Sequence, residues 1–288
     1  MNLASARILL TGASGGLGGA LAQQLAASGA ALLLAGRDPE RLAEIGRSLP
    51  RAQGITHSTV RADLTQPEGV AAAAGAAREF RANVLINNAG VGGFGLYERH
   101  EWGEIDTLLA TNLTAPLRLT HALLPWLKAR PQAAIVNIGS TFGSLPFAGF
   151  AAYSAAKAGL RGFSQALRRE LADTSVAVVH IAPRAIDTAL NSAAVVALNR
   201  DLGNPSDSVE AVARQVVAAL ERGGGEHHLG FPERFFAWLN GVAPALIDRG
   251  LAGKLAVIKR HALAPLSPSP SPAAREEGDE RDAARLSL

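Results

Sequence analysis

Two side chains near the middle of the chain have the types and the spacing of a proton-transfer pair. Tyr153 and Lys157 stand four residues apart in the stretch AAYSAAKAGL, so they share one face of the helix that this Ala-rich stretch predicts. A tyrosine hydroxyl has a pKa of about 10, but a nearby ammonium favours the phenolate and lowers that pKa. Because the chain has only two tyrosines, this placement favours chemistry over packing. The pair would be a tunable proton donor.

Ser140 brings a hydroxyl group to the same region. It ends the apolar run AAIVNIGS, which has the composition of a buried strand, and it precedes Tyr153 by thirteen residues. A hydroxyl at the carboxyl end of a strand can hydrogen-bond a carbonyl oxygen and stabilise the negative charge that develops there. The three residues together indicate acid–base chemistry at a carbonyl or an alcohol.

A glycine-rich turn, TGASGGLG, lies near the N-terminus between a strand-like run and a helix-like run. Gly12, Gly16 and Gly18 let the backbone turn sharply and approach a phosphate without obstruction by a Cβ atom. The following helix would present free N–H groups and its positive dipole end to that anion. A glycine-rich turn alone also occurs as a plain tight turn, but the strand before it and the helix after it favour a dinucleotide.

The end of the second strand-like run indicates which dinucleotide. NAD is usually selected by an acidic residue that binds the ribose 2′-hydroxyl, whereas the 2′-phosphate of NADP needs a cation. Here Gly36 takes the place of the acid and Arg37 follows it, and arginine binds phosphate in a bidentate manner. Asp38 precedes Pro39 and is better explained as a helix cap. The sequence therefore favours NADP(H) over NAD(H); an ordinary surface role for Arg37 is the alternative.

Apolar runs alternate with helix-like segments over about the first 220 residues. Continuous apolar strands separated by helices predict a parallel sheet covered on both faces, with a ligand crevice at the carboxyl ends of the strands. The expected fold class is α/β, a doubly wound parallel sheet in a single domain. Thr65 and Glu68 have the spacing of a capping box and predict another helix start there.

Composition excludes several kinds of site. The chain has no cysteine, so disulfides, iron–sulfur clusters and thiolate chemistry are absent. Its seven histidines show no metal-binding spacing, and we expect no metal. The net charge of +3 is too small and too dispersed to indicate a nucleic-acid partner. No signal-peptide-like apolar run precedes the glycine-rich turn, and we expect a cytoplasmic protein.

Six motifs in this order resemble the short-chain dehydrogenase/reductase family, in its NADP-preferring type with a C-terminal extension. The resemblance covers roughly residues 5–222. The motifs are TGxxxGxG at Thr11–Gly18, an acidic residue after the third strand at Asp63, NNAG at Asn87–Gly90, a helix asparagine at Asn112, the serine at Ser140, and YxxxK at Tyr153–Lys157.

The resemblance implies a Rossmann-type fold and specific roles for individual residues. Asn112 would hold a water in a proton relay through Lys157, and Lys157 would also bind the nicotinamide ribose. Asp63 and residues 88–90 would border the adenosine. The implied catalytic residues are Asn112, Ser140, Tyr153 and Lys157. The implied cofactor-binding residues are Thr11, Gly12, Ser14, Gly16, Leu17, Gly18, Arg37, Asp63, Leu64, Asn88, Ala89, Gly90, Tyr153, Lys157, Pro183, Ile186 and Thr188.

The implied reaction is the interconversion of a ketone or aldehyde and an alcohol. Hydride passes between NADP(H) and the substrate carbon, while Tyr153 supplies or removes the proton. A homodimer or homotetramer is expected. Two alternatives differ in class: a dinucleotide-binding regulatory protein without turnover, and a peripheral membrane reductase linked to lipid. The first would be expected to lack part of the catalytic set, and this chain has every member.

One motif departs from the family pattern. After the sixth strand the family usually has PGxxxT, but this chain reads PRAIDT, with Arg184 in place of the glycine. That side chain could alter the loop, reach the substrate or face the solvent. The segment from Thr188 to Asp201 follows it and is rich in Ala, Val and Leu. We interpret it as a substrate lid, and its composition indicates an apolar substrate.

Three regions are expected along the chain: a dinucleotide-binding catalytic domain at 1–225, an apolar helical extension at 226–264 and a disordered tail at 265–288. The extension has an aromatic start and reads as one or two helices interrupted at Pro244. Its apolar side chains should be buried against another surface. The substrate cleft is favoured for this role over a second subunit and over membrane contact through 231–260. The tail combines Pro/Ser repeats with three arginines and five carboxylates.

Overall fold

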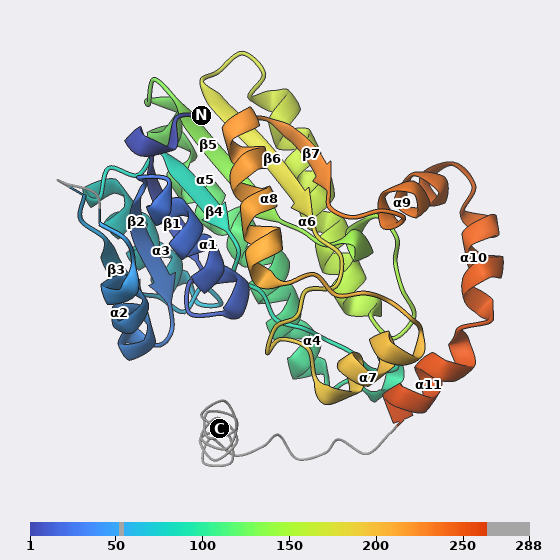
Figure 1. The fold of residues 1–288 in the computed structure, drawn as a ribbon. Coiled ribbons are helices and arrows are strands. Elements are labelled where there is room, and N and C mark those ends of the chain that lie inside the picture. The colour runs from blue at the N-terminus through green and yellow to red at the C-terminus, as the bar shows by residue number, and fades with distance from the viewer. Residues whose placement is uncertain (52–54, 264–288) are drawn as a thin grey trace, which may run out of the picture.

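Seven parallel strands form one twisted sheet at the centre of the computed structural model, which describes residues 1–51 and 55–263 (Figure 1). The strand order is β3-β2-β1-β4-β5-β6-β7. This arrangement confirms the α/β, doubly wound fold class. The strands are β1 Arg7–Thr11, β2 Ala31–Gly36, β3 Ser58–Arg61, β4 Val84–Asn87, β5 Ala133–Ile138, β6 Val176–Ala182 and β7 Gly225–His228.

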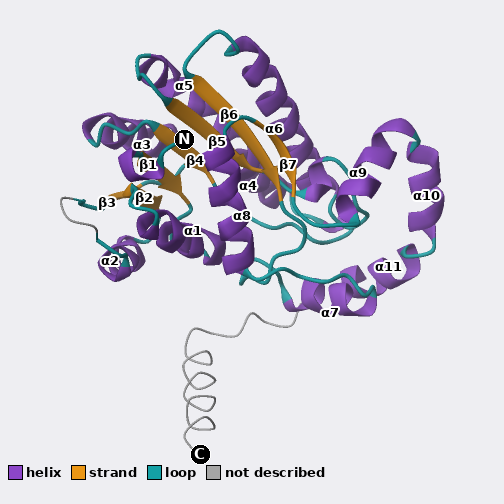
Figure 2. Ribbon diagram, turned by 45° about the horizontal axis from the view of Figure 1, so that its top comes forward, coloured by secondary structure: helices purple, strands orange, loops and turns teal. Residues whose placement is uncertain are grey.

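Helices cover both faces of the sheet because its central strands are apolar on both sides. Helices α1, α2 and α8 contribute to one buried core, and α3, α5 and α6 contribute to the other (Figures 1 and 2). The α-helices that precede β7 are α1 Gly16–Ala27, α2 Pro39–Ser48, α3 Pro67–Glu79, α4 Trp102–Leu109, α5 Ala115–Lys128, α6 Ala151–Glu170, α7 Ala193–Asp201 and α8 Val209–Arg222. A π-helical turn, Ala110–Thr114, joins α4 to α5.

The strand order reverses between β1 and β4, and this reversal sets the place of the ligand crevice. In a doubly wound sheet the connections from the two strands leave toward opposite faces, which opens a crevice at their carboxyl ends. The glycine-rich turn follows β1 and the NNAG motif begins in β4. Both motifs therefore meet at the switch point.

Strand β7 was missed by the sequence analysis. It pairs in parallel with β6, in the register Val179↔Gly225 to Ala182↔His228. Its sequence, GEHH, has neither an apolar run nor strict alternation, so it carries no strand signal. Gly223, Gly224 and Gly225 all have positive φ, and they turn the chain from α8 back to the sheet edge.

The two marked helix starts had different outcomes. Asp38 caps α2 as predicted: its Oδ1 accepts hydrogen bonds from the backbone N–H groups of Glu40 and Arg41, each at 3.0 Å. The predicted capping box at Thr65 is wrong. Gln66 stands at the N-cap of α3 without a side-chain hydrogen bond, because the Thr65 hydroxyl donates to Asp63 instead, at 2.8 Å.

Three helices, rather than one or two, follow β7: α9 Glu233–Val242, α10 Pro244–Ala252 and α11 Leu255–Leu263. Pro244 is the first residue of α10, where its missing N–H costs nothing. The three helices form an arm that bends away from the β7 edge and returns toward α7 (Figures 1 and 2). The predicted tail at 265–288 lies outside the described residues.

Candidate active site

Ser140, Tyr153 and Lys157 come together at the carboxyl end of β5. Ser140 caps the 3-10 turn Thr141–Gly143, and its Oγ accepts a hydrogen bond from the Phe142 backbone N–H at 3.2 Å. Tyr153 and Lys157 lie in the first two turns of α6 and share one of its faces. The Lys157 Nζ lies 5.7 Å from the centre of the Tyr153 ring. The three side chains that the sequence analysis singled out therefore form one cluster.

Burial has the largest effect on the acidity of Tyr153. It raises the pKa of the phenol above its ordinary value, while a hydrogen bond with the Ser140 hydroxyl acts in the opposite direction. The sequence analysis expected the Lys157 ammonium to lower the pKa of Tyr153; the loss of solvent around the phenol raises it instead. Tyr153 is therefore a protonated phenol at neutral pH.

Lys157 is 5% exposed and donates a hydrogen bond from Nζ to the Ile138 backbone carbonyl at 3.0 Å. Burial lowers the pKa of its ammonium to about 8. A lysine with this pKa loses its proton more readily than a surface lysine. At neutral pH the Lys157 side chain is still positively charged beside Tyr153, and it can also take part in proton exchange.

Asn112 lies in the π-helical turn and is fully buried. Its Nδ2 donates to the Val91 carbonyl at 2.8 Å, and its Oδ1 accepts from the Val91 N–H at 2.9 Å. A Cβ atom at Gly90 would lie 2.9 Å from the Asn112 Oδ1 and 3.8 Å from the Lys157 Nζ. Asn112 thus fixes the chain after the NNAG motif, beside Lys157, and a side chain at position 90 would displace the Asn112 amide.

The glycine-rich turn and the NNAG motif form one rigid cradle. The Thr11 Oγ1 accepts hydrogen bonds from the Asn88 and Ala89 N–H groups at 3.0 and 3.1 Å, and the Asn88 Nδ2 donates to the Thr11 carbonyl at 3.0 Å. Gly12 has φ +64°, and a Cβ atom there would lie 2.7 Å from the Ala89 Cα. At Gly18 a Cβ atom would collide with the Gly12 carbonyl oxygen.

The start of α1 fits an anionic group. Gly15 precedes the helix and makes no side-chain cap, and the first turn contains no acidic residue. The free N–H groups and the positive dipole end of α1 are therefore available to a phosphate. The geometry around these glycines fits a dinucleotide pyrophosphate.

The end of β2 provides space and a cation. A Cβ atom at position 36 would lie 3.2 Å from the Ser14 Oγ. Because glycine has no Cβ atom, the space between the end of β2 and the glycine-rich turn stays open; we call this space the corner. Arg37 is exposed, and its charge helps to lower the pKa of Asp63, although hydrogen bonds from Thr65 have the larger effect. Arg37 and Asp63 thus face the same corner.

The other sequence-predicted cofactor residues divide into two groups: those that lie beside the glycine-rich turn or the Ser140 turn, and those whose side chains pack against the apolar cores. Thr188 lies near the glycine-rich turn, because a Cβ atom at Gly16 would lie 3.5 Å from its Cγ2. The Pro183 carbonyl accepts a hydrogen bond from the Thr141 N–H at 2.9 Å, which ties the loop after β6 to the Ser140 turn. The side chains of the second group pack against the apolar cores; they are Leu17, Leu64 and Ile186.

Arg184 makes ion pairs beside the segment that the sequence analysis interpreted as a substrate lid. Its Nε and Nη2 donate to the two carboxylate oxygens of Asp207 at 2.8 and 2.6 Å, and its Nη1 lies 3.7 Å from the Glu233 Oε1 at the start of α9. Ile186 and Asp207 pair in a parallel bridge. Arg184 therefore joins the loop after β6, the segment before α8 and the C-terminal arm. Sequence reasoning left its role undecided because Asp207 and Glu233 are distant in the chain.

Four phenylalanines form a cluster beside Tyr153, and the sequence analysis did not identify them. The Phe142 and Phe150 rings lie 4.9 Å apart and each lies 6.3 Å from the Tyr153 ring. Phe94 and Phe147 extend the cluster at 5.0 and 5.5 Å from their nearest partners. The signal in the sequence was the aromatic content of the segment between Ser140 and Tyr153.

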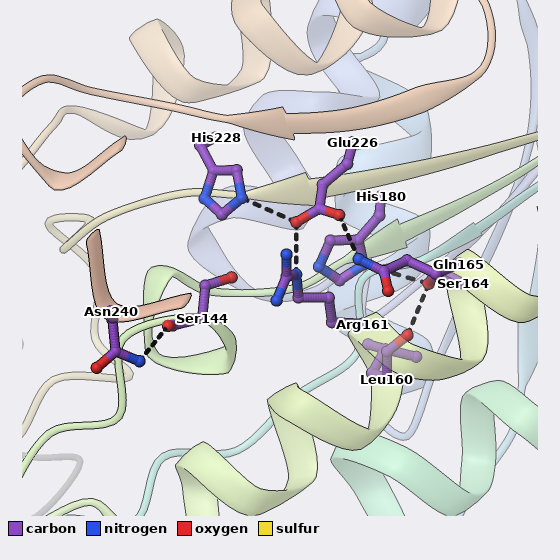
Figure 3. A network of polar contacts seen from close by, with 9 residues as sticks. All are labelled: Ser144, Leu160, Arg161, Ser164, Gln165, His180, Glu226, His228 and Asn240. Carbon is purple, nitrogen blue, oxygen red and sulfur yellow. Dashed lines mark hydrogen bonds and ion pairs between the residues drawn. The ribbon is translucent and has the colours of Figure 1, made fainter. Parts of the chain in front are cut away.

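The inner side of the C-terminal arm contacts this aromatic loop. The Asn240 Nδ2 in α9 donates to the Ser144 carbonyl at 3.0 Å (Figure 3). A Cβ atom at Gly149 would lie 3.2 Å from the Ile258 side chain in α11 and 2.7 Å from the Phe94 ring. The His261 Nε2 lies 2.9 Å from the Asp201 carboxylate, so α11 also holds the end of α7.

Known proteins match both the sequence and the fold. A family model described as short chain dehydrogenase matches residues 6–199. The chain belongs to the short-chain dehydrogenase family. It is 35% identical over 225 residues to a 3-oxoacyl-(acyl-carrier-protein) reductase FabG of Vibrio cholerae, covering 74% of this chain and 90% of that protein.

Two solved structures extend this comparison. A short-chain dehydrogenase from Burkholderia cenocepacia in complex with NADP has a TM-score of 0.73 and 27% identity, covering 87% of this chain and 99% of that one. A bulky-bulky ketone specific alcohol dehydrogenase from Comamonas testosteroni has a TM-score of 0.70 and 29% identity, covering 88% and 95%. This short-chain dehydrogenase is thus an oxidoreductase that acts on CH–OH and C=O groups.

Proposed function

We propose that this short-chain dehydrogenase uses NADP(H) to interconvert an apolar ketone or aldehyde and the corresponding alcohol. The convergence of Ser140, Tyr153 and Lys157 beside the glycine cradle carries this proposal. NADP(H), when bound, supplies or accepts the hydride. A homodimer or homotetramer in the cytoplasm remains a prediction.

The residues of the chain would divide the work as follows. Tyr153 gives its proton to the carbonyl oxygen during reduction, since the buried phenol is protonated at neutral pH. Ser140 donates a hydrogen bond to the same oxygen and stabilises its developing charge. Lys157 holds the nicotinamide ribose and returns a proton to Tyr153, and Asn112 holds a water beside Lys157.

The choice of NADP(H) over NAD(H) rests on the corner at the end of β2. Gly36 leaves that corner open, and Arg37 is exposed beside it. A guanidinium binds a ribose 2′-phosphate in a bidentate manner. The Burkholderia relative, whose structure contains NADP, agrees with this choice.

The apolar character of the substrate rests on the surroundings of Tyr153. Four phenylalanine rings cluster beside it, and residues 188–201 carry the exposed apolar side chains of Leu190 and Val196. Desolvating such surfaces favours an apolar ligand. The Comamonas relative, specific for bulky-bulky ketones, is consistent with this class.

The test replaces Tyr153 by Phe. The variant keeps the ring packing and loses the proton donor, so we expect NADPH affinity near that of the wild type and turnover lower by roughly 10²–10⁴-fold. The measurement is NADPH oxidation against fatty-acyl, steroid and small aromatic ketones, with NADPH binding followed separately by fluorescence. Retention of more than about a tenth of the wild-type rate on any active ketone would contradict the role of Tyr153.

A further inference from the structure

The outer side of the C-terminal arm carries an exposed aromatic face. Phe231 and Trp238 are 78% and 61% exposed, and Phe235 and Phe236 are 47% and 40% exposed. The Phe235 ring lies 5.6 Å from the Phe236 ring and 6.0 Å from the Trp238 ring. Val242 and Leu246 continue the apolar surface onto α10. We call these six residues the aromatic face.

A basic groove adjoins the aromatic face at the β7 edge of the sheet. It has a volume of about 540 Å³ and is lined by three arginines, Arg161, Arg222 and Arg234, with Trp238 and Ala237 on its apolar side. Glu226 is the acidic residue among the groove-lining residues described. Trp238 belongs to the groove and to the aromatic face, so the two surfaces are continuous.

The charge of Glu226 is already compensated. Its carboxylate accepts hydrogen bonds from Arg161, from Gln165 at 2.8 Å and from His228 at 2.8 Å (Figure 3). Although burial acts to raise the pKa of Glu226, these hydrogen bonds lower it overall. Arg222 and Arg234 are exposed, and they remain the uncompensated charges of the groove among the described lining residues.

The arm as a whole is also basic. Arg249 and Lys254 add positive charge along α10 and before α11, where Asp248 is the opposing carboxylate. Glu233, at the start of α9, faces the Arg184 guanidinium at 3.7 Å. The arm therefore combines an exposed aromatic surface, bordered by Arg222 and Arg234 of the groove, with further positive charge on α10 and before α11.

We propose that the aromatic face and the basic groove dock this enzyme on an anionic phospholipid surface. Aromatic and aliphatic side chains enter the boundary between headgroups and acyl chains, while arginine and lysine are attracted by the negative headgroups. A second copy of the chain is the weaker occupant. In a two-fold symmetric dimer this patch would pack against its own copy, which would bring two surfaces of the same positive charge together.

The docking inference goes beyond the proposed function and does not depend on it. The inner side of the same arm contacts the aromatic loop beside Tyr153, through Asn240 and Ile258. A docked enzyme would therefore hold its active-site approach near the lipid. No helix within residues 1–51 and 55–263 has the length and hydropathy of a membrane-spanning segment.

The test measures co-sedimentation of the full chain with vesicles. One set contains equal parts of phosphatidylglycerol and phosphatidylcholine, and the other contains phosphatidylcholine alone. We expect binding to the anionic set at about 50 mM salt, loss of binding at about 500 mM salt, and little binding to the neutral set. Trp238 emission should move to shorter wavelength on binding, and Trp238→Ser should remove that change.

Two double variants isolate the charge contribution. Arg222→Gln with Arg234→Gln should weaken vesicle binding by roughly fivefold per arginine. Arg47→Gln with Arg51→Gln removes the same charge from exposed positions at the α2 end of the molecule, and we expect vesicle binding close to that of the wild type. Far-UV circular dichroism and thermal unfolding of both variants verify that they are folded.

Three results would overturn the docking inference. The first is no binding to anionic vesicles at low salt, and the second is equal weakening by both double variants. The third is a concentration-dependent dimer, seen by light scattering, that Trp238→Ser converts to a monomer; the aromatic face would then be a subunit interface. Because ketone reduction is not the readout, failure here leaves the proposed function untouched.

Discussion

Burial governs the protonation of the Tyr153–Lys157 pair. It raises the pKa of the phenol and lowers the pKa of the ammonium to about 8, so the two groups lie further apart in acidity than their free side chains and the ammonium is the stronger acid. A proton therefore passes favourably from the Lys157 ammonium to a Tyr153 phenolate. The residue types and their spacing could be read from the sequence, but the direction of the Tyr153 shift could not, because it depends on residues that cover the ring.

The charge at position 37 should determine cofactor choice. We predict tighter binding of NADPH than of NADH by the wild type, and inversion of that order in Arg37→Asp. A charge-assisted contact to the 2′-phosphate contributes on the order of 1.5–3 kcal/mol, or about one to two decades in affinity. Isothermal titration with both nucleotides measures this. Equal affinities in the wild type would mean that Arg37 remains in solvent.

Among the elements, the strands with continuous apolar runs were predictable and the polar ones were not. The VLIN and AAIVNI segments are fully buried strands, and their composition indicated this. Strand β7 depends on pairing with β6, and its Glu226 is tied to α6 by hydrogen bonds. Contacts of this kind join distant parts of the chain, so no local pattern encodes them. The same reason explains why the partners of Arg184 were not predicted.

Arg184 should hold the base of the lid, and its loss should free the lid without disturbing Tyr153. Arg184→Ala removes two charge-assisted hydrogen bonds to Asp207, worth roughly 1.5–3 kcal/mol in closure of the lid. We expect substrate KM to rise by at least about tenfold with a smaller change in kcat. Trypsin should cleave after Arg200, in α7, faster than in the wild type.

Arg200→Ala is the matched control for the kinetic measurement. It removes an exposed arginine from the same lid, whose Nε lies 3.8 Å from the neighbouring Asp201 carboxylate, and KM should stay near the wild-type value. If Arg184→Ala lowers the melting temperature but leaves KM and the cleavage rate after Arg200 unchanged, Arg184 stabilises the fold and does not position the lid.

At the scale of the whole molecule, a row of polar side chains crosses the sheet. Asn87, Asn137, His180 and Glu226 occupy adjacent register positions on β4, β5, β6 and β7. The Asn87 Nδ2 donates to the Asn137 Oδ1 at 2.8 Å, and the Asn137 Nδ2 donates to the Ser164 Oγ at 2.9 Å. Because buried polar groups must be paired, this row fixes the register of strands whose remaining contacts are apolar.

His180 is a fully buried titratable group of this row, and its protonation state follows from its partners. The Ser164 hydroxyl donates to the Leu160 carbonyl at 2.7 Å, so the His180 Nδ1 is the donor in its 3.2 Å contact with the Ser164 Oγ. The Nε2 is then unprotonated, and it has no hydrogen-bond partner within residues 1–51 and 55–263. Burial lowers the pKa of His180 to about 4.

Acid should therefore destabilise the whole fold through His180. Between pH 6.5 and about 4 the unfolded chain binds a proton at this histidine and the folded chain does not, so the free energy of unfolding falls as the pH falls. The predicted contribution is on the order of 3 kcal/mol across that interval. Urea unfolding at several pH values measures it. His180→Asn keeps a donor toward Ser164 and cannot titrate, so its stability should fall less steeply with acid, although its stability at pH 7 is reduced by the lost ring. Identical pH slopes for the two proteins would show that other groups cause the acid sensitivity.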